Sequence, residues 1–130
     1  MEEKGKKYFR THEDLAIYKL AFSVAMEIFE QSKKFPVEEK YFLTDQIRRC
    51  SRSVCANMAE VWRKCRYKAA FVAKLNDSEA EVAEGQVWLK FAVKCQYIKV
   101  EKARELYETY NQVLSRLVKM ITHPDDWLLD

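Results

Sequence analysis

The chain has 130 residues, of which 48% are hydrophobic, and it contains only two glycines and two prolines. Its 23 basic and 20 acidic side chains give a formal net charge of +3. This composition is sufficient for one packed core, and so few turn residues argue against a sheet-rich fold. No stretch approaches the roughly 18 consecutive apolar residues of a membrane span, and no apolar signal core follows the charged N-terminus, so we expect a cytoplasmic protein without a membrane partner.

The first two predicted helices cover about residues 12–34 and 38–64. In the first, apolar side chains recur at steps of three and four in two neighbouring seams, which predicts a wide buried face. Phe35-Pro36 ends this pattern, because a residue before proline is disfavoured in helical geometry. The second helix carries one apolar stripe, formed by Leu43, Ile47, Cys50, Val54, Met58 and Val61.

The third and fourth predicted helices cover about residues 68–96 and 100–122. We expect a turn before the third, because one helix unbroken to Tyr97 would be about 90 Å long, too long for a single domain. The third helix has a seven-residue apolar repeat whose small members, Ser78 and Gly85, predict a close helix crossing. His123-Pro124 ends the fourth helix, and the tail with Trp127 is expected to dock on its own bundle or on a partner.

Four amphipathic helices joined by short connections predict one all-α domain over residues 1–130, an up-down-up-down antiparallel four-helix bundle. The first and third helices carry more large apolar side chains than one narrow seam requires. Such surplus apolar surface indicates a partner, by default a second copy of the chain.

Basic residues are concentrated in the second predicted helix and the turn after it. Between Thr44 and Lys74 eight cations stand against two anions, whereas from Leu75 to the end seven cations stand against ten anions. We call seven of these cations the basic strip: Arg48, Arg49, Arg52, Arg63, Lys64, Arg66 and Lys68.

The basic strip is a candidate nucleic-acid surface, because arginines on one face of a rigid helix can contact successive phosphates. Trp62 and Tyr67 lie close enough in sequence to stack on bases. The alternative is structural: a solvated face, or ion pairs to the acidic third helix through Glu79, Glu81 and Glu84.

The sequence gives no basis for catalysis or for a cofactor. Both histidines lie at helix ends, so neither a di-metal site built from Glu-x-x-His pairs nor Cys-His chemistry is expected. The four cysteines lack zinc-ligand spacing, and two glycines do not make a phosphate-binding loop. We therefore expect no enzyme, no metal, no cofactor and no small-molecule substrate. Glu81 and Glu84 are expected to be structural, with a buried pair to Arg48 or Arg49 open to them.

Several segments together resemble a family signature: Phe35-Pro36, Glu38-Glu39, the run from Leu43 to Arg49, and SRSVCANMAE from Ser51 to Glu60. They are similar to the 23S rRNA-intervening-sequence proteins, bacterial four-helix bundles whose pattern reads approximately F-P-x-x-E-x-x-x-L-x-x-Q-I-R-R, then S-x-x-A-N-I-A-E-G. The similarity continues into the fourth helix and so covers nearly the whole chain. Val61 replaces the usual final glycine, and Trp62-Arg63-Lys64 replaces a Gly-Arg turn, so the second helix is expected to extend through this corner.

The resemblance implies a bundle that assembles as a cyclic homo-oligomer, with a pentamer favoured. The family also resembles the accessory variability protein of diversity-generating retroelements. That relative is a pentameric barrel whose basic surface binds a reverse transcriptase and nucleic acid. By position, Arg48, Arg49 and Arg52 match the family's basic motif, while Asn57 and Glu60 match a polar pair for which we expect a structural role.

Two functions follow as hypotheses. The first is a non-catalytic oligomeric bundle that binds structured RNA or a nucleoprotein through the basic strip. The second is a protein–protein adaptor that recruits an enzyme through exposed apolar surface and has no affinity for nucleic acid.

Overall fold

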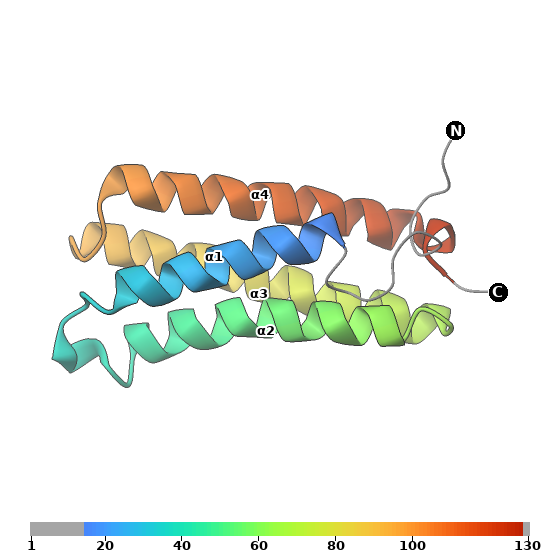
Figure 1. The fold of residues 1–130 in the computed structure, drawn as a ribbon, viewed down its shortest axis with the longest axis horizontal. Helices are drawn as coiled ribbons and strands as arrows, with labels where there is room; N and C mark the ends of the chain where they lie inside the picture. Colours follow the sequence, from blue (N-terminus) through green and yellow to red (C-terminus); the bar gives the residue numbers. More distant parts are fainter. Residues whose placement is uncertain (1–14, 129–130) are drawn as a thin grey trace.

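The computed structural model describes residues 15–128, which form four antiparallel helices packed side by side (Figure 1). Helix α1 covers Ala16–Ser32, α2 Leu43–Arg63, α3 Lys68–Lys94 and α4 Val100–Thr122, with short 3-10 helices η3 at Val37–Glu39 and η4 at Pro124–Asp126. Helix α1 packs on α2 and α4, and α3 packs on the same two helices. The predicted all-α antiparallel four-helix bundle is confirmed. None of the described helices is long and apolar enough to cross a membrane.

The predicted apolar stripes of α2, α3 and α4 meet in the centre of the bundle and are buried along their whole length. In α1 only one of the two seams is wholly buried, and its members are Ile17, Ala21, Val24 and Ile28. The other seam leads out of the core, since Phe22 is 48% exposed and Phe29 is half-buried. The buried face of α1 is therefore narrower than the sequence predicted.

Helix α2 begins at Leu43, later than the predicted start near residue 38. Residues 37–39 form η3 instead, and Phe42 has φ −121° and ψ −102°, which is not helical backbone. Glu39 then stabilises the start of α2, because its Oε1 accepts a hydrogen bond of 3.2 Å from the Leu43 N–H. At the other end, α2 includes Val61 to Arg63, so the helix does extend through the corner where the family usually has glycine.

Helices α1 and α3 end slightly before their predicted limits, at Ser32 and Lys94. The end of α3 is closed by Gln96, which has a positive φ of 64°. The Gln96 N–H donates to the Val93 carbonyl and the Tyr97 N–H to the Ala92 carbonyl, both at 2.9 Å, which is the hydrogen-bond pattern of a Schellman cap. The predicted residues 12–14 of the first helix lie outside the described part.

Gly85 marks a close crossing between helices, as its place in the repeat predicted. A Cβ atom there would lie 2.9 Å from Cε2 of Tyr110 on α4 and 3.5 Å from Sγ of Cys50 on α2. Tyr110 is fully buried and fills the space that a side chain at position 85 would need. Its hydroxyl and that of Ser78 are buried without a hydrogen-bond partner among the described residues.

The C-terminal tail docks on its own bundle as far as it is described. Trp127 and Leu128 are half-buried against the core, and Trp127 lines one groove together with Leu15 and Met120. An exposed ion pair of 3.4 Å joins Lys68 Nζ to Asp125 Oδ1 beside it. The two ends of the described chain thus meet at one end of the bundle, opposite the α1–α2 and α3–α4 connections (Figure 1).

Candidate nucleic-acid interface

Arg48, the first member of the basic strip, is held against α1. Its Nε donates a hydrogen bond of 2.7 Å to the Oγ of Ser32, and that buried hydroxyl donates in turn to the Phe29 carbonyl at 3.0 Å. The guanidinium carbon of Arg48 lies 4.9 Å from the centroid of the Phe29 ring. A residue on the surface of α2 is therefore fixed by contacts with the last turn of α1.

The same ring attracts two more cations. The guanidinium carbon of Arg52 lies 5.6 Å from the Phe29 centroid, and Lys33 Nζ lies 4.8 Å from it. Lys33 also forms an exposed ion pair of 3.3 Å with Glu30. We call Phe29, Lys33, Arg48 and Arg52 the Phe29 cluster. It places three positive charges around one aromatic ring on the α1–α2 surface.

The ion pair that links α2 to α3 is made by Lys74, outside the basic strip. Its Nζ lies 2.8 Å from Oε1 of Glu60 and 3.7 Å from Oδ2 of Asp77, and it donates a hydrogen bond of 3.5 Å to Oδ1 of Asn57. Asn57 and Glu60, the polar pair matched to the family signature, therefore contact the same lysine. Within residues 15–128, no ion pair joins the arginines of the strip to a carboxylate.

Glu81 and Glu84 line a groove between α2 and α3, together with Arg49 and Arg52. Burial raises the pKa of Glu81, and the charge of Glu84 raises it further, while the nearby charge of Arg49 only partly opposes this. Glu84 accepts a hydrogen bond of 3.3 Å from the indole of Trp88. Among residues 15–128 neither Arg48 nor Arg49 forms an ion pair with these glutamates, and Arg48 is turned toward α1.

The rest of the strip lies at the far end of α2 and in the turn that follows. Arg63 is about 22 Å along the helix axis from Arg48, and Arg63, Lys64 and Arg66 are exposed. Tyr67 is 66% exposed, whereas Trp62 is half-buried against the core. The strip is therefore two groups of cations, one in the first half of α2 and one from the C-terminal end of α2 to the start of α3, and the exposed ring of Tyr67 lies in the second group.

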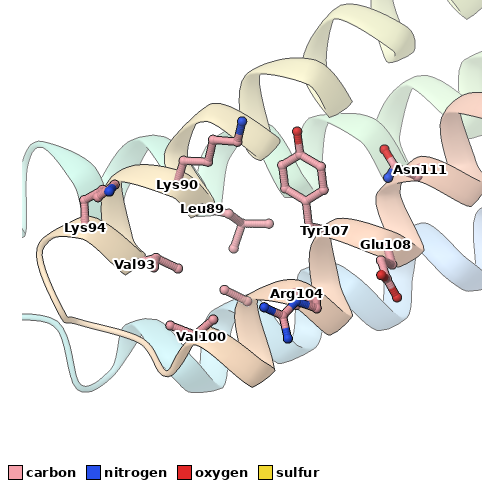
Figure 2. A pocket seen from close by; sticks show the side chains of 10 residues that line it. Leu89, Lys90, Val93, Lys94, Val100, Arg104, Tyr107, Glu108 and Asn111 are labelled. Carbon is pink, nitrogen blue, oxygen red and sulfur yellow. The ribbon is translucent and has the colours of Figure 1, made fainter.

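A second surface lies between the C-terminal half of α3 and the first half of α4 (Figure 2). It is a groove of about 580 Å³ whose lining includes the apolar residues Leu89, Val93, Val100 and Ala103. Tyr107 closes one side, with Lys90 Nζ 5.5 Å from its ring centroid. Three large apolar side chains outside the groove are about half exposed, namely Phe91 on α3 and Phe22 and Met26 on α1. These are the surfaces on which an adaptor function would depend.

No catalytic site is evident in the described part of the chain. Burial raises the pKa of the Cys50 thiol to about 12 and that of Cys55 to about 11, so both are neutral, poorly nucleophilic thiols near neutral pH. Among residues 15–128 no three His, Cys, Asp or Glu side chains are grouped so that they could hold a metal ion.

The sequence did not reveal the contribution of α1 to this surface. Phe29 fits the apolar periodicity of its helix, which predicts a core position, and Ser32 and Lys33 belong to no motif. The sequence feature that pointed to this surface is a separation of four residues, which occurs between Phe29 and Lys33 and between Arg48 and Arg52. That spacing places each pair on one helical face but does not say that the two faces meet.

Comparison with solved structures gives a similar fold. A protein of unknown function from the S23 ribosomal protein family of Bacteroides thetaiotaomicron VPI-5482 matches with a TM-score of 0.73 and 24% sequence identity, over 82% of this chain and 98% of that one. No curated protein matched the chain. A sequence profile described as 23S rRNA-intervening sequence protein matches residues 13–119. This match runs from the start of α1 into the last turn of α4, and the chain belongs to the 23S rRNA-intervening sequence protein family.

Proposed function

We propose that this protein is a non-catalytic helical bundle that binds structured RNA, alone or in a nucleoprotein, through the basic strip. The observation that carries the proposal is the absence of carboxylate partners for the strip's arginines within residues 15–128. Cations paired within the protein would have little charge left for a ligand. Unpaired arginines on a rigid helix can instead neutralise phosphates and release their counterions.

The test is a fluorescence-anisotropy titration of a structured ribosomal RNA fragment at several salt concentrations. We expect submicromolar binding that weakens steeply with salt, since each phosphate contact contributes about 0.9 to the slope of log affinity against log salt on a duplex. No binding even at low salt would overturn the proposal. It would favour the second candidate, an adaptor that recruits a protein through the α3–α4 groove, whose apolar lining is the observation in its favour.

We also propose that the bundle assembles as a cyclic homo-oligomer, a pentamer. The exposed apolar face of α1, with Phe22 and Met26, and the α3–α4 groove are different surfaces of one chain. A contact between the α1 face of one copy and the groove of the next is heterologous, and such contacts close into a ring when the rotation between copies permits. This arrangement would cover Phe22 and Met26, and the contact would end before the last turn of α1, so that Phe29 and Lys33 stay open.

The mass of the assembly tests the ring. Native mass spectrometry is expected to give five times the 15.5 kDa of one chain. Met26→Glu should dissociate it, because the substitution places a charge on the proposed contact face. Val118→Glu, at a similarly exposed position on α4 away from the groove, should leave the mass unchanged. A monomeric wild-type protein at micromolar concentration would contradict the assembly.

A further inference from the structure

We propose that the Phe29 cluster is a preorganised binding site for the phosphodiester backbone of RNA, with Phe29 and Ser32 as its positioning residues. The inference rests on the proposed function and deepens it, because it assigns the phosphate contact to one place and adds α1 to the interface.

Three cations from two helices converge on the Phe29 ring. Lys33, Arg48 and Arg52 all lie within 5.6 Å of the centroid of one ring. The three charges therefore lie within about 10 Å of one another, roughly one Debye length at 0.1 M salt, so their fields add at the surface between them. Attraction of each cation to the face of the ring partly offsets the repulsion among them.

Arg48, the central cation, is held in place before any ligand binds. Arg48 is half-buried, and its Nε is bound to the hydroxyl of Ser32, which is only 2% exposed. The hydroxyl is itself fixed by its bond to the Phe29 carbonyl. The two terminal nitrogens of Arg48 have no partner among the described residues. An ordered guanidinium with free donors binds an oxyanion at a smaller entropic cost than a mobile one.

Few carboxylates lie within ion-pair distance of the Phe29 cluster. Glu30 pairs with Lys33, and it is the only carboxylate within ion-pair distance of the cluster among residues 15–128. Asp45 is on α2 one turn before Arg48 but forms no ion pair with it. Glu81 and Glu84 share a groove with Arg52 but form no ion pair with it, so both guanidinium groups of the cluster keep terminal donors for an external anion.

These features favour phosphate over a base as the ligand. The cations already occupy the surroundings of the Phe29 ring, so the ring is not free to stack on a base. Guanidinium groups match the several acceptor oxygens of a phosphate. Backbone contacts position a nucleic acid and carry no sequence information, so this site should contribute affinity without base preference.

The test removes the ring and keeps every charge. Phe29→Leu should weaken binding of a fluorescein-labelled RNA hairpin by about tenfold and lower the salt slope by about one contact. Phe29→Tyr retains an aromatic face and should restore both values. Ser32→Ala, which frees Arg48 without changing charge, should reduce affinity by a smaller factor. Phe91→Leu, a matched change at an exposed ring on α3, should have no effect, and melting curves should show that all variants are folded.

The outcomes separate this site from the broader proposal. The preorganised site would be overturned if Phe29→Leu and Ser32→Ala both bound the hairpin with wild-type affinity and salt slope while reversal of the arginine charges abolished binding. RNA binding by the strip would then remain. Failure of the wild-type protein to bind the hairpin at any salt concentration would overturn both.

Discussion

Replacement of Arg48 and Arg52 together by glutamate is expected to weaken RNA binding by about 100-fold. Each charge-assisted hydrogen bond contributes about 1.5–3 kcal/mol, and about 1.4 kcal/mol corresponds to tenfold in affinity. The salt slope should fall by about 1.8, because two phosphate contacts are lost. The fold should remain, since the loss within the protein is one hydrogen bond to Ser32 and two contacts with the Phe29 ring. Anisotropy titrations and thermal melting measure the two effects.

The matched control is Arg116→Glu with Lys119→Glu on α4. Both residues are exposed, and neither forms an ion pair within residues 15–128, so the control changes the net charge equally on another face. We expect it to bind RNA nearly as well as the wild type. An equal loss in the two double variants would mean that net charge alone governs binding and that the α1–α2 surface has no special role.

Gly85→Val is expected to destabilise the bundle by about 2 kcal/mol, within the range for overpacking a well-filled core. The added side chain would begin with a Cβ 2.9 Å from the ring of Tyr110, which is fully buried and cannot move into solvent. For a chain of this size each kcal/mol shifts the melting temperature by about 4 °C. Thermal denaturation followed by circular dichroism should therefore show a midpoint about 8 °C lower.

Ala83→Val separates this clash from helix propensity, because Ala83 is exposed on the same helix. It should cost about 0.5 kcal/mol. A second variant at the contact gives a stricter test. Adding Tyr110→Leu to Gly85→Val removes the ring that the valine meets, so the double variant should lose less than the sum of the two single losses. Strict additivity would show that the two residues do not compete for space.

The core was predictable because burial follows a regular period. Every apolar residue of the α2 stripe, from Leu43 to Val61, is buried as the spacing predicted. The helix ends were less predictable, because they depend on individual backbone conformations. Gln96 adopts a positive φ that sequence pattern assigns to glycine or asparagine. Phe42 has non-helical backbone angles although neither neighbour is proline or glycine. The Leu43 N–H then donates its hydrogen bond to the side chain of Glu39.

The candidate site was predictable only for the part that lies on one helix. The spacing of Arg48 and Arg52 places them on a common face of α2 without further knowledge. Their contacts depend on how α1 is rotated about its own axis. Phe22 is exposed and Phe29 is only half-buried, so this rotation differs from the one that the apolar seams of α1 suggest. Such a rotation is decided by packing between helices, so no local pattern in α2 could have named Phe29 or Ser32.

The placement of both ends of the described chain at one end of the bundle has a consequence for the proposed ring. Cyclic symmetry relates all protomers by rotation about one axis, so equivalent features of every copy lie at the same height along it. With the bundles aligned along that axis, the Phe29 clusters, near the α1–α2 connection, would form a circle on the rim opposite Leu15 and Leu128. An RNA that reaches two of them would bind the second at a high effective concentration, and its avidity would exceed the affinity of a single protomer without any new contact.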